Sequence, residues 1–443
     1  MTTHGLPYWL DLERPAFPTL EGDATADAAI IGAGIAGLKL ARYLSQYGMT
    51  AIVLEGAKVG EGASGRNQGT INHSPNLGYA QCIHLHSRQI ARDLWQLGLE
   101  NHRLLQEQID DYGIDCDYLN TGQTYLVRRD TAGWQDTLAA YRADFVLLRE
   151  DGFDVAWFDE VEARSAGGSP LYAGGLHYTT DAQFHSGKFV IGLAQGIAQA
   201  TGIRIYEGAR VERIELADHM TRVIAGGHLV TAPVVFLATN ALAPQYVPRL
   251  ERSLRAERGQ VIVTEPLAER PCAGSFATNL AWWREIREAD GRFRLLFGGG
   301  RTRDEPDSLF PQFQVGGRPH PKLELDGFRP SAEHQRRLDA QFATLFAQLA
   351  GVRITHRWGG LQSFTADDLP LVGRFDSGRN LWGIAGFCGR GNCHSDVGTR
   401  FLAGRIAGAT SDIERRFGHL FELMRPDRES ARWGPWKSIH DSL

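Results

Sequence analysis

The 443-residue sequence contains no apolar run long enough to span a membrane and no block of five or more basic residues. A membrane helix needs about 20 predominantly apolar residues, so we expect no membrane span. The net charge of −5 and the missing basic block argue against binding to nucleic acid or an anionic membrane surface. The segment Met1–Leu20 has neither the basic start nor the apolar middle of a signal peptide.

Cysteine is also scarce, and the five cysteines fit no zinc-binding spacing. The sequence has no HExxH motif, no nucleophile-elbow serine and no paired metal ligands, so it predicts no metal site. An odd and sparse set of cysteines is typical of a reducing compartment. We therefore expect a soluble cytoplasmic protein whose partners are small molecules, and a homo-oligomer stays open.

The apolar patterns near the N-terminus predict the start of a nucleotide-binding sheet. Asp27–Ile31 predicts a buried strand, Ile35–Tyr47 a helix and Thr50–Glu55 a second buried strand. This strand–turn–helix–strand order begins a doubly wound parallel sheet. The stretch before Asp23 is rich in proline and is expected to be extended. A chain of this length exceeds one ordinary core, so at least two domains are expected.

Segments of another character alternate with the nucleotide-binding type. Polar helices are predicted over Ser87–Asp111 and Gly133–Asp151, strands over Gln260–Thr264 and Arg292–Phe297, and a helix over Ser331–Leu349. Each domain is therefore expected to be discontinuous in sequence. The predicted division assigns residues 1–80, 176–254 and 356–443 to the nucleotide-binding domain, and residues 81–175 and 255–355 to a substrate domain.

The first strand leads directly into the turn Gly32-Ala33-Gly34-Ile35-Ala36-Gly37. Gly32 permits a tight turn, Gly34 lets the backbone approach a pyrophosphate, and Gly37 lets the helix pack closely against the strand. The helix N-terminus directs free N–H groups and a partial positive charge toward phosphates. Between two strands, this turn predicts a bound dinucleotide.

Two further features bear on which dinucleotide is bound. Glu55, followed by Gly56, ends the second strand, where a carboxylate accepts hydrogen bonds from ribose hydroxyls. The glycine turn and Glu55 do not distinguish NAD from FAD. The Gly-rich segment Gly60–Gly69 suits a cofactor that continues past the pyrophosphate toward a flavin ring, which favours FAD. The alternative is that Gly60–Gly69 is a flexible surface loop.

With these motifs, the sequence resembles the D-amino-acid-oxidase-type FAD-dependent oxidoreductases, and within them the γ-glutamylputrescine oxidase branch. The resemblance covers nearly the whole chain. It implies a mixed α/β (α+β overall) fold, in which a Rossmann-like FAD-binding domain is interleaved with an antiparallel-sheet substrate domain. The matching segments are Ala26–Leu38, Val53–Gly69, Val234–Ala241, Leu295–Gly300, Trp358–Arg374 and Asn380–Asn392, together with Pro7–Trp9 and Pro15–Asp23 for the branch.

The resemblance also implies roles for particular residues toward FAD. Glu55 would hold the adenosine ribose, and the backbone of Val211 would bind the adenine. A helix beginning near Ser395 would direct its N-terminus at the pyrimidine end of the flavin, where it would stabilise the reduced anion. The remaining residues implied to line the pyrophosphate and flavin are Ala63, Ser64, Gly65, Arg66, Asn67, Gln68, Thr239, Gly386, Cys388, Gly389, Arg390, Gly391 and Asn392.

The sequence departs from the family pattern where a substrate carboxylate would bind. Members that act on α-amino acids commonly carry an arginine before the TxDxxPxxG motif, and Gln362 stands there instead. A neutral amide cannot form the bidentate ion pair that an arginine forms with a carboxylate. An amine without an adjacent carboxylate is therefore the favoured substrate. Arg390 either supplies an anion site from another direction or pairs with a local acid, and both readings stay open.

Aromatic residues could hold a cationic amine by cation–π attraction. Trp358 is the first candidate for such a wall, although most such residues are simply part of the core. The other candidates are Trp282, Trp283, Phe364 and Phe387. His185 is interpreted as a helix-entry residue, with no acid or base role.

The sequence bears on two further properties of the cofactor. Relatives of the sarcosine oxidase group use a lysine near the flavin to promote the reaction with oxygen, and Arg294–Gly298 contains none. Reoxidation by dioxygen or by another acceptor therefore stays open. Gly360 and Leu361 occupy the position of the flavin-linking cysteine of that group, so we expect non-covalent FAD. Cys388 and His73 are the residual candidates for a covalent link.

We therefore expect FAD-dependent oxidation of an amine to an imine, which hydrolyses to an aldehyde and ammonia or a smaller amine. Dioxygen would reoxidise the flavin and form hydrogen peroxide. The cofactor performs the hydride chemistry, and the protein orients and desolvates the substrate. The alternatives are an α-amino-acid oxidase or dehydrogenase, a flavin-binding subunit without turnover of its own, and an NAD-dependent enzyme.

Overall fold

The computed structural model describes residues 2–299, 328–376 and 378–428. Strand β3 lies inside a six-stranded sheet whose strands follow the order β10-β4-β3-β14-β21-β20. The first five strands are parallel, and β20 at the edge is antiparallel to β21. Every residue of β3 and β4 is buried, as expected for strands covered on both faces. The strands are β10 (Arg204–Tyr206), β4 (Ala51–Leu54), β3 (Ala28–Ile31), β14 (Val234–Leu237), β21 (Leu381–Ala385) and β20 (Leu371–Asp376).

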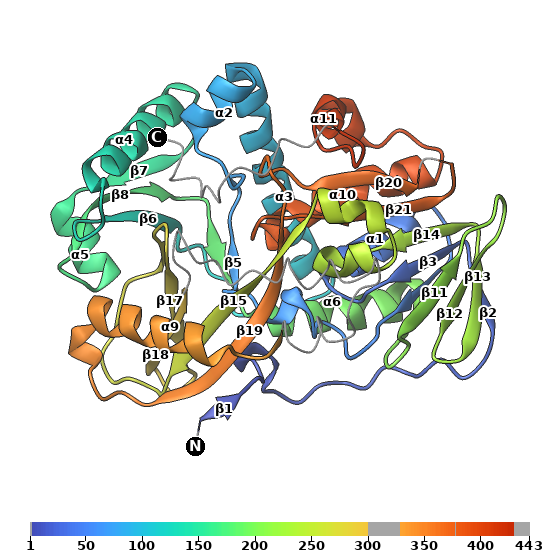
Figure 1. The fold of residues 1–443 in the computed structure, drawn as a ribbon, viewed down its shortest axis with the longest axis horizontal. Helices are drawn as coiled ribbons and strands as arrows, with labels where there is room; N and C mark the ends of the chain where they lie inside the picture. The colour runs from blue at the N-terminus through green and yellow to red at the C-terminus, as the bar shows by residue number, and fades with distance from the viewer. Residues whose placement is uncertain (1, 300–327, 377, 429–443) are drawn as a thin grey trace.

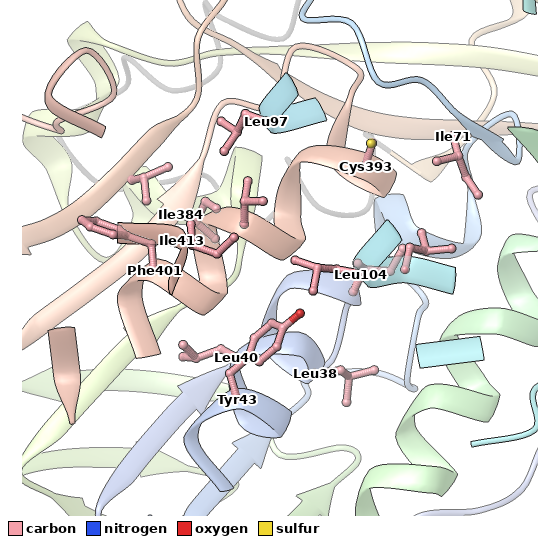
Figure 2. Close-up of a cluster of buried hydrophobic side chains, with 14 of the residues drawn as sticks. Leu38, Leu40, Tyr43, Ile71, Leu97, Leu104, Ile384, Cys393, Phe401 and Ile413 are labelled. Carbon is pink, nitrogen blue, oxygen red and sulfur yellow. The ribbon is translucent and has the colours of Figure 1, made fainter. Parts of the chain in front are cut away.

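Helices pack against this sheet and against one another. Helix α1 contacts α10 and α6, and α10 contacts α3 and α11. Figure 2 shows apolar side chains from α1, α3, α10 and β21 meeting in the shared core, among them Leu40, Leu104, Ile384 and Phe401. The helices are α1 (Ile35–Gln46), α3 (Arg88–Asp111), α6 (Ser186–Thr201), α10 (Gly391–Ile406) and α11 (Asp412–Glu422).

A nine-stranded mixed sheet forms the other half of the molecule, on the left in Figure 1. Its order is β1-β19-β15-β18-β17-β16-β6-β8-β7, and all neighbours are antiparallel except β1 with β19 and β16 with β6. Helices α2 (Tyr79–Leu85), α4 (Trp134–Glu150), α5 (Glu160–Gly167) and α9 (Ala332–Leu345) accompany these strands. The strands are β1 (Thr3–His4), β19 (Ile354–Phe364), β15 (Arg255–Thr264), β18 (Phe293–Gly299), β17 (Trp282–Arg287), β16 (Ser275–Ala277), β6 (Gln123–Arg128), β8 (Tyr172–Tyr178) and β7 (Val155–Phe158).

Two small sheets complete the fold. A four-stranded sheet, in the order β11-β12-β13-β2, lies beside the six-stranded sheet at the right of Figure 1, and β5 pairs with β9. These strands are β11 (Val211–Glu215), β12 (Thr221–Ala225), β13 (His228–Ala232), β2 (Ala24–Thr25), β5 (Thr70–Ile71) and β9 (Ala182–Gln183). Short 3₁₀ helices are η1 (Tyr8–Leu10), η2 (Ala63–Gly65), η3 (Asn240–Gln245), η4 (Pro248–Arg252) and η5 (Ala347–Leu349).

The predicted fold class, with a Rossmann-like sheet and a largely antiparallel second sheet, is confirmed. One predicted helix is shorter than expected, because α9 ends at Leu345 and the chain turns at Phe346, whose side chain is buried among aromatic residues. The stretch before Asp23 is also not wholly extended, because Tyr8–Leu10 forms η1.

The predicted division into domains stays a proposal. Its boundaries at 175/176 and 355/356 fall inside β8 and β19, so the chain crosses between sheets at other points. Residues 300–327 and 429–443, which belong to the predicted segments 255–355 and 356–443, lie outside the described residues. Among the described residues, none of the helices combines the length and apolar content that crossing a bilayer requires.

Candidate functional site

A cavity of about 640 Å³ lies between the two large sheets. Ile31 and Leu54, the last residues of β3 and β4, line it on one side, and Val261 of β15 and Gly360 of β19 line it on the other. Ligands of open α/β sheets bind outside the carboxyl ends of the parallel strands, which is where this cavity begins. The cavity is large enough to hold the dinucleotide part of a cofactor and the reactive group of the same cofactor in one continuous space.

The glycine turn between β3 and α1 borders this cavity. Gly32 has φ +106°, and a Cβ there would lie 3.1 Å from the carbonyl oxygen of Ala238. A Cβ on Gly37 would lie only 2.0 Å from the carbonyl oxygen of Gly32, so the helix packs against the turn as predicted. Gly37 itself does not line the cavity, and its contribution is this close approach. Gly34, Ile35 and Ala36 line the cavity at the N-terminus of α1.

Glu55 is held at the end of β4 by two backbone donors. Its Oε2 accepts a hydrogen bond from the Ala33 N–H at 2.8 Å, and its Oε1 accepts one from the Ala57 N–H at 2.9 Å. The carboxylate borders the cavity, as does Gly56. The two backbone donors thus fix the carboxylate at the edge of the cavity.

The Gly60–Gly69 segment is an ordered wall of the cavity, so its interpretation as a flexible surface loop is wrong. Arg66 is only 7% exposed, and its guanidinium donates to Glu61 and to the carbonyl oxygens of Gly5 and Gly359. Burial lowers the pKa of Arg66 below its ordinary value, although Glu61 opposes this shift. These bonds anchor the segment. Ala63, Ser64, Asn67 and Gln68 also line the cavity, whereas Gly65 packs behind it against Leu10.

Amide side chains connect this segment to the second glycine turn. Asn67 and Asn392 hydrogen-bond to each other at 3.2 Å, and Asn392 Nδ2 also donates to the Thr70 carbonyl oxygen at 2.9 Å. Ser64 Oγ accepts from the Ile35 N–H at 2.9 Å, which attaches the same segment to the start of α1. The segments predicted to contact pyrophosphate and flavin are therefore joined around one cavity.

Helix α10 begins at Gly391, and the predicted start near Ser395 is wrong by one turn. The N–H groups of Cys393 and His394 already donate to the Arg390 carbonyl oxygen, so the helical bonding pattern starts there. Gly389, Gly391 and Asn392 border the cavity, and the helix N-terminus therefore lies at its surface. Gly386 lies behind the lining, where its N–H donates to Asn240 Oδ1 at 3.1 Å.

Trp358 does not belong to the cavity, which corrects its prediction as a substrate-binding residue. Its side chain is 0% exposed, packs with Trp9 and Val261, and donates from Nε1 to the Arg66 carbonyl oxygen at 3.0 Å. Its position on β19 directs it into the core. Trp283 is likewise a core residue, whereas Trp282, Phe364 and Phe387 line the cavity.

Gln362 and Arg390 both line the cavity and both carry an unsatisfied buried atom. Gln362 Oε1 and Arg390 Nε have no hydrogen-bond partner among the described residues. The Arg390 guanidinium lies 5.6 Å from the centre of the Tyr125 ring. It forms no ion pair with a carboxylate in the described part of the chain, so the reading in which it pairs with a local acid finds no support. A buried donor and a buried acceptor are thus free to bind a ligand.

The other predicted residues can also be located. Val211, the first residue of β11, and Thr239, which follows β14, both line the cavity, and the Val211 carbonyl accepts from the Tyr246 hydroxyl at 3.1 Å. Cys388 lines the cavity, but His73 is buried away from it in a hydrogen bond with Asp181 at 2.6 Å. His185 caps α6 by accepting from the Lys188 N–H, which confirms its interpretation as a helix-entry residue.

Sequence reasoning missed several cavity residues, among them Tyr125 and Asp368. Tyr125 lies on β6, in the region where the family resemblance is weakest. Asp368 follows directly after the acid of the TxDxxPxxG motif, and that adjacency was the only available signal. In the part of the chain that the structure describes, no cluster of three or more His, Cys, Asp or Glu residues could hold a metal ion.

Comparison with known proteins identifies the class of protein. The family model for FAD dependent oxidoreductases, abbreviated DAO, matches residues 27–404, and the chain belongs to this family. It is 27% identical over 431 residues to gamma-glutamylputrescine oxidoreductase of Escherichia coli K12, with 94% of this chain and 91% of that protein covered. It is 26% identical over 422 residues to the probable oxidoreductase OrdL of Haemophilus influenzae, with coverages of 91% and 89%.

Solved structures of related enzymes share the fold. Glycine oxidase from Geobacillus kaustophilus superposes with a TM-score of 0.73 at 19% identity, with 92% of this chain and all of that chain covered. L-proline dehydrogenase from P. horikoshii superposes with a TM-score of 0.71 at 17% identity, with 92% of this chain and 98% of that chain covered. The protein is thus an FAD-dependent oxidoreductase, which confirms the predicted family and cofactor. The cavity residues fit FAD, because the N-terminus of α1 after its glycine turn, the Glu55 carboxylate and the N-terminus of α10 border one space.

Proposed function

We propose that the protein oxidises the C–N bond of an amine, as γ-glutamylputrescine oxidation requires, and that dioxygen reoxidises the cofactor with formation of hydrogen peroxide. The observation that carries this proposal is Gln362. Its neutral amide lines the cavity with an unpartnered Oε1, where relatives that act on α-amino acids commonly carry an arginine. An amide oxygen can accept a hydrogen bond from an amine N–H but cannot neutralise a carboxylate.

The relative with 27% identity, gamma-glutamylputrescine oxidoreductase, supports the same substrate class because the match covers nearly all of both chains. When bound, FAD supplies the acceptor for the hydride that leaves the carbon next to nitrogen. The protein's own residues perform the remaining tasks. Trp282, Phe364 and Phe387 exclude water, and Gln362 orients the amine nitrogen. The resulting imine hydrolyses to an aldehyde and releases ammonia or a smaller amine.

An α-amino-acid oxidase or dehydrogenase is the second candidate function. Arg390 favours it, because its guanidinium faces the cavity and has no carboxylate partner among the described residues. An anionic group of the substrate could satisfy it. The same guanidinium is compatible with an amine substrate that carries a carboxylate at its far end, as γ-glutamylputrescine does.

The choice of electron acceptor forms a separate part of the proposal. No lysine occurs in Arg294–Gly298, and Arg294 on β18 is ion-paired with Glu288. This arrangement supplies no free cation of the kind that promotes oxygen reduction in the sarcosine oxidase group. Dioxygen is proposed as the acceptor by analogy with the oxidases of the family, and the missing cation favours the competing outcome, a dehydrogenase that uses another acceptor. We also propose that FAD is held non-covalently.

A panel of substrates tests these proposals. Putrescine, γ-glutamylputrescine, glycine, sarcosine and D-alanine are supplied to the yellow holoenzyme, and peroxide formation and dye reduction are measured in parallel. Highest kcat/KM with the amines and stoichiometric peroxide are the expected results. Dye reduction without peroxide would contradict the choice of dioxygen. Faster turnover of the amino acids, or no turnover of any compound, would contradict the amine assignment.

A further inference from the structure

Two consecutive carboxylates between β19 and β20 have different surroundings. Asp367 is held by Arg428, whose Nε and Nη2 donate to its two oxygens at 2.7 and 2.8 Å. Asp368 forms no ion pair with any described cation, is half-buried, and lines the cavity. Its backbone has φ +59°, a left-handed conformation that aspartate tolerates better than most residues. One acid therefore stabilises the loop, and the other is directed at the site.

The groups around Asp368 come from three segments. Asn76, which follows β5, donates from Nδ2 to Asp368 Oδ1 at 3.0 Å. Cys388, on the turn before α10, places its thiol against the carboxylate, and Arg390 on the same turn acts on it at longer range. Asp367 is the remaining charged neighbour. The neighbourhood thus contains two hydrogen-bond donors, the Asn76 amide and the Cys388 thiol, together with one distant cation and one competing anion, and no described cation forms a direct ion pair with Asp368.

This environment makes the carboxylate an unusually strong proton acceptor for an aspartate. Burial is the largest cause and raises the pKa of Asp368 from 3.8 to about 7, with Asp367 contributing in the same direction. The hydrogen bond from Asn76 and the charge of Arg390 oppose the shift. A general base works best when its pKa lies near the working pH.

We infer that Asp368 binds the ammonium group of the amine substrate and accepts its proton, which makes the amine ready for oxidation. The inference rests on the proposed function, because the step needs an amine substrate whose nitrogen arrives as an ammonium ion. In this step an N–H bond breaks and an O–H bond forms on the carboxylate. The electron pair of the broken bond stays on nitrogen, and no oxidation takes place. A cationic amine and a carboxylate become a neutral amine and a carboxylic acid.

The location of Asp368 explains why the transfer is feasible. Removal from water and the positive charge of Arg390 both lower the pKa of a bound ammonium, while burial raises that of the acid. The pKa of the bound ammonium and the pKa of the Asp368 carboxyl group approach each other only inside the cavity. A half-buried carboxylate without a counter-ion is costly to a folded protein, and a cationic ligand offsets that cost.

The test compares the holoenzyme with D368N, D368E and the matched control D367N. Each protein is mixed anaerobically with γ-glutamylputrescine, and flavin bleaching is followed across pH. For the wild type we expect the second-order rate constant of flavin reduction by the amine to rise about tenfold per pH unit up to about pH 7 and then to level off. In D368N this rise between acid and neutral pH should disappear and the rate constant should fall about 10²-fold, whereas D368E and D367N should keep the rise.

A second measurement separates catalysis from folding. The Kd of γ-glutamylputrescine, obtained from the dependence of the anaerobic bleaching rate on amine concentration, should be higher in D368N at unchanged FAD content. If D368N keeps the wild-type pH profile and affinity, the inference is wrong even though the amine activity stands. If no amine bleaches the flavin of the wild-type protein, the proposed function is wrong, and the inference that rests on it is wrong as well.

Discussion

The Lys39 ammonium of α1 and the Asp396 carboxylate of α10 form an ion pair in the protein interior, where both side chains are 0% exposed. Lys39 also donates to Ser395 Oγ at 3.1 Å, and Asp396 accepts from the Tyr43 hydroxyl at 3.0 Å. Both helices begin at the cavity, α1 at the Gly32–Gly37 turn and α10 at the second glycine turn. The pair therefore fixes the two helix N-termini relative to each other.

Removal of one partner from this pair should be strongly destabilising. Lys39→Met leaves the Asp396 carboxylate buried without a counter-ion, which costs about 3–5 kcal/mol in comparable cases. The free energy of unfolding, from urea titration of the holoenzyme, measures the loss. The double variant K39M/D396L removes both charges and should recover much of the stability. Equal destabilisation of the double and single variants would show that the ion pair itself is not the cause.

Glu55 should control how tightly FAD is retained. Glu55→Gln keeps the size of the side chain but removes the charge, and charge-assisted hydrogen bonds contribute about 1.5–3 kcal/mol. We expect FAD affinity to fall by about 10- to 100-fold, measured from the visible absorbance that remains after dialysis. Glu212→Gln, an exposed acid on β11 outside the cavity, is the control and should stay fully yellow. Unchanged retention in both variants would remove Glu55 from the cofactor site.

The parts that local pattern determines were predictable from sequence. The strand, glycine turn, helix and second strand around Gly32–Glu55 occur as predicted, because each depends on neighbouring residues and on the burial of two short apolar runs. The prediction that Trp358 contacts the substrate was wrong. A strand residue faces the core or the cavity according to its register with β15, and composition does not fix that register. Asp368 was missed because its environment is assembled from Asn76 and Cys388, which lie on other segments of the chain.

Arg390 should distinguish substrates that carry a distant carboxylate from those that do not. Its guanidinium lines the cavity with an unpartnered Nε, so a substrate anion gains a charge-assisted bond there. In Arg390→Gln, kcat/KM for γ-glutamylputrescine should fall about 10- to 100-fold more than that for putrescine. Steady-state kinetics with both amines provide the measurement. An equal loss for both would mean that Arg390 supports the flavin or the fold instead of the substrate.

The raised pKa of Asp368 also predicts how stability depends on pH. The folded protein holds the Asp368 proton up to about pH 7, whereas the unfolded chain releases it near 3.8. Between these values the folded state binds more protons, so this residue's contribution to stability declines as pH rises and stays low above about pH 7. Asp368→Asn has no such proton to lose. Its melting temperature relative to the wild type should therefore increase across this window, which thermal unfolding of the holoenzyme at several pH values would show. A D368N curve that runs parallel to the wild type would show that the Asp368 carboxylate is not held at a cost in the folded protein.

Asp27 is the opposite case, because its hydrogen bonds with Thr50 lower its pKa. Asp27→Asn should therefore be less stable than the wild type above the acid's ordinary pKa of 3.8, and its stability should approach that of the wild type as pH falls.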